Sequence, residues 1–527
     1  MLLQMTVLHC YFCTRLGRRL AFFFGFEIVH GTKLIPGIAQ PSDPETAFFA
    51  IDTRANMEHP MTHPLRSAGY ITRNHTQCPT RCSGQRSSRR QVKMQGSFLT
   101  MASLLFILIL SQPVQARTFH CRGGDVSCLI AAIKQANVQP GLRHEIRLGK
   151  GTYALMAVDN QTGGPNGLPS ITRKLTIKGV GAGSTVIERD ADALDFRLLH
   201  VAATGSLTLE GLTLRGGRVE FSGGGIFNLG TVTILRSTLI DNVAFGGFSS
   251  IGGGLSNMGG ALTLINSNIS GNIAVAGDNG NAAGIHSQDG TVSIINSSIV
   301  DNVALGADAG AGAGLLSQRD ALTIINSTIA DNTATGPGGG LALGASTVTL
   351  VNSTVARNSA CGAGGSVRGG GGLLNAGGAV TIINSTIAGN STCSGSPLFF
   401  GDGGGLLNLP GGSVRLLNTI IALNTAPLGG SDCSGVITSQ GHNVIGDPTN
   451  CTVELQPFDL TGNPGLGAFT DNGLPGEGHF PLLATSRAID AGDDNACPPM
   501  DQLGQLRVGT CDIGAVEFQG SLVAAVR

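Results

Sequence analysis

Residues 326–358 read NSTIADNTATGPGGGLALGASTVTLVNSTVARN. The stretch opens with NSTIADN and closes with NSTVARN, and between them lie a triple glycine and one run of alternating apolar and polar residues. Related segments recur along the chain: RSTLIDN (236–242), NSNISGN (266–272), NSSIVDN (296–302), NSTIAGN (384–390) and NTIIALN (418–424). Their last Asn returns at intervals of 30, 30, 30, 26, 32 and 34 residues, which indicates a repeated structural unit.

Two further phrases keep the same period. One is rich in glycine, as in GGGIFN (223–228) and GGGLLN (370–375), and the other alternates, as in TVTIL (231–235) and TVSII (291–295). All three phrases are too short for a helix, and alternation predicts a strand with one buried face. Three strands per period, joined by turns, form one coil of a parallel β-helix whose coils stack about 4.8 Å apart. We therefore predict an all-β solenoid of about ten coils.

Stacking places equivalent residues in columns. Ile269, Ile299, Ile329, Val355 and Ile387 are predicted to stack inward, as are Ile294, Ile324, Leu350 and Ile382. The recurring Asn suits sharp corners, because Asn tolerates the left-handed conformation and can stack in hydrogen-bonded ladders. Some of these residues also match N-glycosylation acceptors, such as Asn326-Ser327-Thr328, but seven regular copies favour a corner role. The segments between the last Asn and the next glycines are expected to be loops.

Eight cysteines follow residue 116, and they fall in sequence as four close pairs. Eight cysteines allow 105 pairings in principle. Local pairing is the simplest hypothesis for a one-dimensional fold, and the third and fourth of these residues occupy the same place in adjacent coils. The predicted disulfides are Cys121–Cys128, Cys361–Cys393, Cys433–Cys451 and Cys497–Cys511.

The chain divides into regions of different composition. Residues 1–93 lack the repeat, and we interpret them as an extension from a start codon placed too far upstream, with a genuine N-terminal domain as the alternative. Residues 94–116 resemble a secretory signal peptide, the alternative being a buried hydrophobic segment. Residues 117–217 are expected to form an N-terminal cap and irregular first coils, with a capping helix over CLIAAIKQAN (128–137). Regular repeats (218–430), a loop-rich C-terminal capping and anchor-like module (431–517) and a tail (518–527) complete the chain.

The distribution of charge along the chain argues against a nucleic-acid partner. Residues 1–116 contain 12 Lys+Arg and 5 Asp+Glu, whereas residues 117–527 contain 21 and 29. The repeats from 221 to 430 contain no Lys. A mildly acidic body of this kind is unlike a phosphate-binding surface, so we expect no nucleic-acid partner. The same scarcity of cations argues against a lyase that holds acidic glycans in a cationic groove.

The chain resembles bacterial exported right-handed β-helix repeat proteins of the polymorphic outer-membrane-protein type, over roughly residues 120–517. Its start, CLIAAIKQAN followed by IRLGKGTYAL, is similar to a degraded form of their CSLREA segment. Its end resembles a choice-of-anchor module in AIDAG (488–492), DIGAVE (512–517) and Asp501-Gln502-Leu503-Gly504 with Arg507 nearby. The resemblance implies a right-handed parallel β-helix, three strands per coil, and export, but no single reaction.

The best candidate site is the column of residues that precede the closing Asn. Asp301 and Asp331 are expected to be neighbours in this column, with Arg357 next to them, which could form a calcium or sugar site. The alternative is a solvated acidic column partly neutralised by Arg357. His286 is placed where most coils carry Asn, as a corner variant. Acidic residues of the C-terminal module are assigned to capping and turns, with calcium as the alternative: Asp490, Asp493, Asp494, Asp501 and Asp512.

These observations favour an exported scaffold at the cell surface, in the outer membrane or secreted. We expect an adhesin-like monomer that binds a polysaccharide or a surface protein, without a cofactor and without a membrane span in the mature chain. The alternative is a polysaccharide lyase or glycoside hydrolase with its site on the lateral face. An autotransporter passenger is a third hypothesis, weakened because nothing after residue 430 resembles a membrane barrel.

Overall fold

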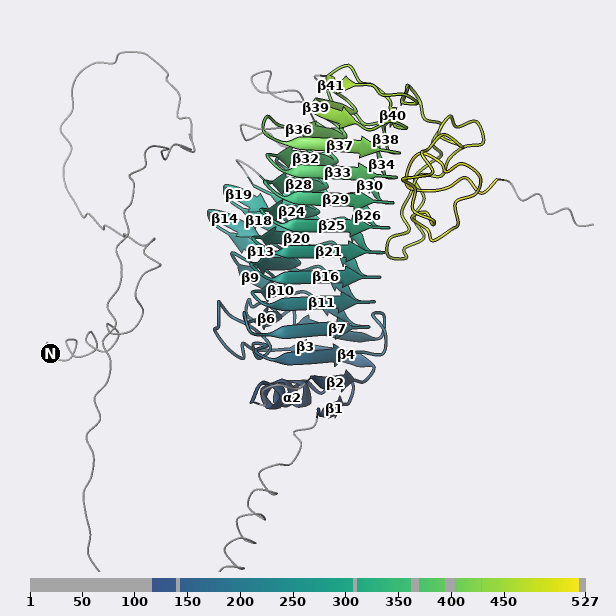
Figure 1. Cartoon of the computed structure of the whole chain (residues 1–527). Coiled ribbons are helices and arrows are strands. Elements are labelled where there is room, and N and C mark those ends of the chain that lie inside the picture. Colours follow the sequence, from purple (N-terminus) through teal and green to yellow (C-terminus); the bar gives the residue numbers. More distant parts are fainter. Residues whose placement is uncertain are drawn as a thin grey trace, which may run out of the picture. The chain divides into compact units, whose positions relative to one another are not determined.

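The computed structural model describes residues 116–138, 143–306, 310–361, 369–393, 403–427 and 429–520. They all belong to one compact unit, Met94–Arg527. The prediction for the signal peptide (94–116) falls almost wholly outside the described residues, and those for residues 1–93 and for most of the tail do so entirely. Within the described part the chain winds into a parallel β-solenoid with one helix, α2 (Val126–Val138), at its start (Figure 1). The predicted all-β solenoid is therefore confirmed.

Four stacks of parallel strands make the walls. Sheet 1 contains β1 (Thr118–Cys121), β2 (His144–Leu148), β4 (Lys174–Lys178), β7 (Ser206–Glu210), β11 (Thr231–Leu235), β16 (Ala261–Ile265), β21 (Thr291–Ile295), β25 (Ala321–Ile325), β29 (Thr347–Val351), β33 (Ala379–Ile383), β37 (Ser413–Leu417), β39 (Cys433–Ser439) and β41 (Cys451–Glu454). Sheet 2 contains β3 (Gly151–Leu155), β5 (Thr185–Arg189), β8 (Thr213–Arg215), β12 (Thr238–Ile240), β17 (Asn268–Ser270), β22 (Ser298–Val300), β26 (Thr328–Ala330), β30 (Thr354–Ala356), β34 (Thr386–Ala388), β38 (Ile420–Ala422), β40 (Val444–Ile445) and β42 (Leu460–Thr461). Sheet 3 contains β9 (Arg218–Glu220), β13 (Val243–Gly246), β18 (Ile273–Ala276), β23 (Val303–Leu305), β27 (Thr333–Ala334), β31 (Ser359–Ala360) and β35 (Ser391–Thr392). Sheet 4 contains β6 (Leu199–Val201), β10 (Ile226–Asn228), β15 (Leu255–Met258), β20 (Ile285–Gln288), β24 (Leu315–Gln318), β28 (Leu341–Gly344), β32 (Leu373–Ala376) and β36 (Leu406–Asn408), and it joins sheet 1 through β39, which pairs with both β36 and β37.

The three predicted phrases correspond to sheets 4, 1 and 2. Sheet 3 was not predicted: the variable segment after each closing Asn begins with a short fourth strand before it becomes a loop. Two of these segments extend into an extra pair, β14 (Ser249–Ile251) with β19 (Asn279–Asn281). Strands of two to four residues with variable sequence carry too little periodicity to be recognised in advance.

The hydrophobic core follows the predicted columns. Ile269, Ile299 and Ile329 pair in register along sheet 2 and are fully buried. Ile294 and Ile324 do the same in sheet 1. Alternation explains why: successive side chains of a strand point to opposite faces, so Val292 and Ile294 face inward while Thr291, Ser293 and Ile295 face out.

The Asn-Ser segments recur because three of their positions hold the corners of the coils together. The first Asn has a positive φ, as at Asn296 (47°) and Asn326 (48°), a conformation that Asn tolerates. The Ser after it is buried and caps the preceding coil, with the backbone N of Ser267 donating to Ser297 Oγ at 3.2 Å. The final Asn forms a ladder through the wall: Asn272 Nδ2 donates to Asn302 Oδ1 at 3.0 Å, and the same bond recurs from coil to coil up to Asn424.

Glycine is required where sheet 4 passes this ladder. A Cβ on Gly254 would lie 2.7 Å from the carbonyl oxygen of Gly284 and 3.0 Å from Cγ of Asn272. No side chain fits between the coils at that point, which accounts for the glycine-rich phrase.

The helix α2 covers the open end of the first coil, as predicted. Asp125 Oδ1 accepts a hydrogen bond from Cys128 N at 2.9 Å and caps the helix. Leu129, Ile133 and Ala136 are buried on its inner face. All four predicted disulfides are present, with Cα–Cα distances of 5.6, 4.7, 5.4 and 6.6 Å in chain order. The pair Cys361–Cys393 joins adjacent coils and thereby confirms the register.

The C-terminal segment differs from the single capping module expected over 431–517. Its first part continues the solenoid, since β39 to β42 stack on β37 and β38. Its second part, residues 464–518, turns back and packs on the outer face of sheet 2. Phe480 is buried there against Ala330, Ala356 and Ala388, whose small side chains leave room for it. This second part is called the flank module below.

Candidate functional site

The predicted acidic column lies at the corner between sheets 2 and 3. Asp301, Asp331 and Arg357 occupy equivalent places in successive coils and have φ values of 56°, 57° and 53°. The backbone N of Asp301 donates to Ala330 O, and that of Asp331 to Ala356 O. The structure thus brings the three predicted residues together.

The charges of this column are partly neutralised. Arg357 forms an ion pair with Asp331, and its guanidinium lies 4.1 Å from the ring centroid of Phe469, which belongs to the flank module. Burial and the carboxylates of Asp331 and Asp471 raise the pKa of Asp301, while Arg357 opposes the shift. Asp301 therefore holds its proton more firmly than an ordinary aspartate does. It lies next to Asp331, whose carboxylate is paired with Arg357.

Such a pair can donate and accept protons in principle. The guanidinium of Arg357, which lies beside this pair of carboxyl groups, already contacts Asp331 and the ring of Phe469. Across the described residues, no group of three or more His, Cys, Asp or Glu side chains is arranged to hold a metal ion. A catalytic role of Asp301, Asp331 and Arg357 remains a prediction.

The register of His286 corrects one expectation. His286 pairs with Ser256 and not with an Asn, while Ser287 takes the Asn position opposite Asn257. The prediction was wrong by one residue, because the phrase AAGIHS (282–287), aligned with GGGIFN (223–228) on their shared Gly-Ile, places Ser287 and not His286 at the Asn position. His286 is buried, its Nδ1 lies 3.3 Å from Ser256 Oγ, and burial lowers its pKa. The His286 side chain therefore supports the wall of the solenoid, and because it is buried it cannot contact a polymer outside.

The flank module attaches to sheet 2 through its motif DQLG (501–504), whose contacts the sequence did not reveal. Gln502 Nε2 donates to Thr328 Oγ1 at 3.2 Å, and to the carbonyls of Gly476 and Gly478 at 2.8 Å each. Its Oε1 accepts from Thr354 Oγ1 at 2.6 Å. One buried amide therefore joins two coils to two turns of the flank module.

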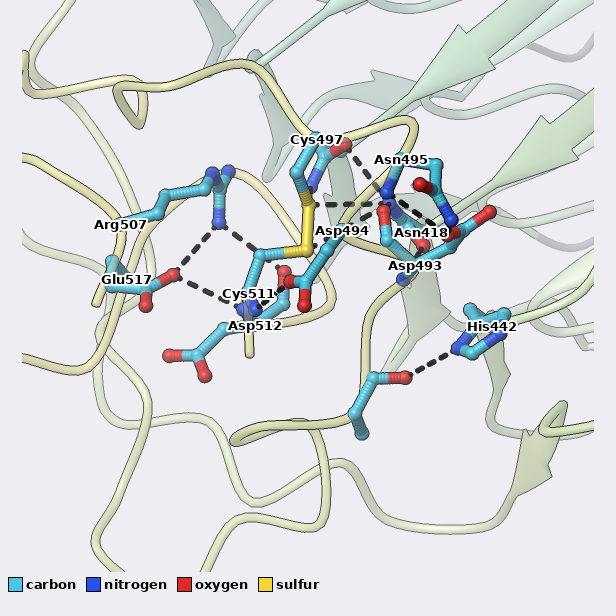
Figure 2. Close-up of a disulfide and its surroundings, with 12 residues drawn as sticks. Asn418, His442, Asp493, Asp494, Asn495, Cys497, Arg507, Cys511, Asp512 and Glu517 are labelled. Carbon is cyan, nitrogen blue, oxygen red and sulfur yellow. Dashed lines mark hydrogen bonds and ion pairs between the residues drawn. A yellow bond between two sulfur atoms is a disulfide. The ribbon is translucent and has the colours of Figure 1, made fainter. Parts of the chain in front are cut away.

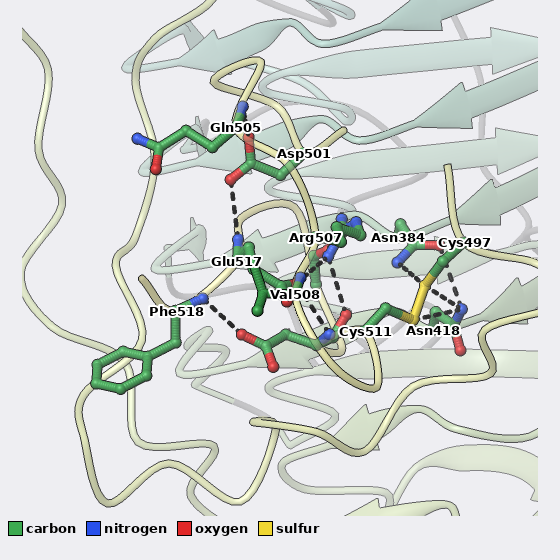
Figure 3. Close-up of polar contacts among 12 residues, drawn as sticks. Asn384, Asn418, Cys497, Asp501, Gln505, Arg507, Val508, Cys511, Glu517 and Phe518 are labelled. Atoms are coloured by element: carbon green, nitrogen blue, oxygen red, sulfur yellow. Dashed lines mark hydrogen bonds and ion pairs between the residues drawn. A yellow bond between two sulfur atoms is a disulfide. The ribbon is translucent and has the colours of Figure 1, made fainter. Parts of the chain in front are cut away.

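Acidic residues of the flank module hold its loops together. Asp501 accepts hydrogen bonds from the backbone N of Leu503, Gln505 and Glu517. Arg507 and Glu517 form a buried ion pair, with Nη1 and Oε2 3.0 Å apart (Figure 3). The predicted turn and capping roles are thus confirmed for Asp501.

The disulfide Cys497–Cys511 lies at the seam between this module and the solenoid. Asn418 Nδ2 donates to Asp493 O at 3.2 Å and lies 3.3 Å from Cys497 Sγ (Figure 2). Asp512 accepts from the backbone N of Asp490 and Phe518, and burial raises its pKa to about 6. The Asp512 carboxylate thus accepts hydrogen bonds from backbone amides, which is the geometry of a structural support.

The outer face of sheet 1 presents a second candidate surface, which the sequence analysis did not single out. Over six coils the outward residues form three columns in register, and we call them the threonine face. The first column is Thr231, Ala261, Thr291, Ala321, Thr347 and Ala379; the second is Thr233, Thr263, Ser293, Thr323, Thr349 and Thr381; the third is Leu235, Ile265, Ile295, Ile325, Val351 and Ile383. All eighteen positions are exposed or half-exposed among the described residues.

A shallow groove borders the first column. It has a volume of about 370 Å³ and is lined by Thr231, Ala261, Thr291 and the turns that precede these strands, which contain glycines and the acidic Asp289. Neither the threonine face nor the groove is covered by the flank module, which packs on sheet 2. The threonine face is thus open and regular across six coils, and its eighteen positions are uncharged, whereas the groove beside it carries Asp289, which is paired with Arg319.

No family model matches the sequence, and no curated protein matches it. Among solved structures, the chain is similar to pectate lyase Pel9A, with 14% identity over 77% of this chain and 98% of that chain and a TM-score of 0.42. The A-module of mannuronan C-5 epimerase AlgE6 from Azotobacter vinelandii has 18% identity over 65% of this chain and 95% of its own, with a TM-score of 0.35. An iota-carrageenase complexed to iota-carrageenan fragments has 10% identity over 76% and 95%, with a TM-score of 0.23. Similarity this distant says nothing of the activity of this chain.

Proposed function

We propose that this protein is an exported β-solenoid scaffold that binds an extended surface or polysaccharide through its lateral wall, as an adhesin does. The observation that carries the proposal is the threonine face, an open and uncharged array of small side chains in register over six coils. A repeating array suits a repeating partner, because many weak contacts add along its length.

Export is part of the same proposal. Four disulfides join cysteines that lie close in the fold, and such bonds persist in oxidising compartments outside the cytoplasm. The signal-like segment 94–116 and the resemblance to exported β-helix repeat proteins support the same placement, at the bacterial surface or in the medium. Across the described residues, no helix has the length and hydrophobicity needed to cross a bilayer. We propose a monomer.

A carbohydrate-active enzyme is the second candidate, and one observation favours it. Asp301 and Asp331 are adjacent, and the pKa of Asp301 is raised by burial and by neighbouring carboxylates. A proton donor beside an ionised partner is the pattern of glycoside hydrolysis. The ion pair of Arg357 with Asp331 weakens this candidate, since the partner carboxylate is already occupied.

Retention on insoluble polysaccharides tests the scaffold proposal. The full chain is compared with the double variant Thr263→Lys/Thr323→Lys, which places two charges on the threonine face. The matched control is Thr238→Lys/Asn268→Lys, which adds the same charge to the same region on sheet 2. We expect the first variant to lose retention and the control to keep it. Equal retention of both variants would contradict a role of this face.

A further inference from the structure

The threonine face has the geometry of a two-dimensional lattice. Coils repeat about every 4.8 Å along the solenoid, and outward residues of one strand repeat about every 6.7 Å, two residues apart. Hydroxyl groups stand at every coil of the second column and at every other coil of the first, where Thr alternates with Ala. The third column presents only aliphatic groups.

The array is rigid before any partner arrives. Each strand from β16 to β29 is hydrogen-bonded to a strand on both sides, and the core behind it is buried. Thr, Ile and Val are β-branched and have restricted χ1 rotamers, so their methyl and hydroxyl groups lose little freedom on binding. A preorganised grid of this kind binds best to a partner that is itself periodic and rigid.

The lack of charged side chains on the threonine face limits which partners it can bind. No ionisable or aromatic residue stands among its eighteen positions. Lys178 and Glu210 lie on the same sheet before it, Arg415 lies after it, and the ion pair of Asp289 with Arg319 lies in the turns beside its first column. A polyanion would need cations to hold it, and the threonine face offers none. A neutral hydroxyl-and-methyl grid is complementary to a neutral lattice of water.

Resting on the proposed function, we propose that the partner of the threonine face is crystalline ice. Water oxygens on the faces of an ice crystal repeat in two directions with spacings similar to those of the grid. Threonine hydroxyls would take part in the outermost water layer, and their methyl groups, with the aliphatic column, would hold that layer in place by excluding disordered water. The alternation of Thr and Ala in the first column leaves a methyl group at every position, so the grid has no gap.

Ice affinity of the full, disulfide-bonded chain tests this proposal. The protein is exposed to a slowly growing ice hemisphere, and the fraction taken into the ice is compared with that of serum albumin, which ice excludes. Inhibition of ice recrystallisation is measured on the same samples. The variants are Thr263→Lys/Thr323→Lys, Thr263→Val/Thr323→Val and the control Thr238→Lys/Asn268→Lys. The valine variant keeps volume and β-branching, and it therefore reports on hydroxyls even if lysine disturbs the fold.

We expect the wild type and the control to enter the ice, the lysine variant to fall to the albumin level, and the valine variant to lose most of the effect. Exclusion of the wild type from ice would overturn the ice proposal. If the wild type were excluded but bound an insoluble polysaccharide in a way that Thr263→Lys/Thr323→Lys abolished, the proposed function would stand and its ice partner would fall. If the wild type bound neither ice nor an insoluble polysaccharide, both the ice proposal and the proposed function would be refuted.

Discussion

Removing one amide from the asparagine ladder should destabilise the wall locally. In Asn302→Ala, the side chain that accepts from Asn272 N at 3.1 Å and from Asn272 Nδ2 at 3.0 Å is lost. Its own Nδ2 donates to Ile269 O at 3.0 Å and to Asn332 Oδ1 at 2.9 Å, and these bonds disappear too. Asn272 is fully buried, so its two donors lose their partner inside the wall.

The magnitude follows from the two donors of Asn272 that lose their acceptor. An unsatisfied buried group costs about 1–3 kcal/mol, so the two together cost roughly 2–6 kcal/mol. In a solenoid each coil contacts only its neighbours, so the loss should remain near the mutated coil. Hydrogen exchange followed by mass spectrometry measures this directly: protection should fall in peptides covering 269–332 and stay unchanged in 118–155.

Asn266→Gly is the matched control. Asn266 is exposed, lies at the start of an NSN corner and has a φ of 50°, which Gly adopts freely. We expect its exchange pattern to match the wild type within about 0.5 kcal/mol. If Asn302→Ala behaved like this control, the ladder would contribute nothing to stability and the explanation of the repeat would be wrong.

Three further predictions concern other contacts. Gln502→Ala removes four hydrogen bonds at the seam, roughly 2–5 kcal/mol, and should make the flank module the first site of limited proteolysis; an unchanged cleavage pattern would show that the seam does not depend on this amide. Replacing Cys361 and Cys393 by Ala opens a loop of sequence separation 32, worth about 3–4 kcal/mol in the loop-closure description, and should lower the thermal midpoint of the oxidised protein but not of the reduced one. Burial raises the pKa of Asp512 from 3.8 to about 6, so the folded flank module retains a proton that the unfolded chain releases, and its stability should rise as pH falls from about 7 to about 4. Protection factors of residues 488–518, corrected for intrinsic exchange at each pH, check the sign; greater protection at high pH would contradict it.

The register of the regular coils was predictable from a period of about 30 residues, because only one alignment of the repeats buries the apolar residues of every strand. A shift by one residue would turn Ile294 and Ile324 outward, so hydrophobic alternation alone selects the observed pairing. The same register placed Cys361 beside Cys393 and put Asp301, Asp331 and Arg357 in one column. Asparagine corners were recognisable because Asn tolerates a left-handed φ, as at Asn296, and because its amide can form a ladder, as at Asn302, although the two roles fall on different Asn residues.

The flank module was not predictable in the same way. Its contacts join residues far apart in sequence, as between Thr328 and Gly478, and no period connects them. Gln502 and Arg507 were visible as motif residues, but their partners on the solenoid, Thr354 on sheet 2 and Asn352 at the corner before it, were not. The threonine face escaped notice because each of its strands reads as an ordinary alternating strand, and only stacking turns single threonines into columns.

The most direct test of the central claim separates binding from chemistry. The full chain, Asp301→Asn, Asp331→Asn and Thr263→Lys/Thr323→Lys are incubated with a panel of polysaccharides and with ice, and both retention and new reducing or unsaturated chain ends are measured. The account predicts retention on at least one of these surfaces, lost only in the threonine variant, with no new chain ends from any protein. Chain ends that form with the wild type and vanish in Asp301→Asn or Asp331→Asn would contradict it and place an enzyme on the acidic column.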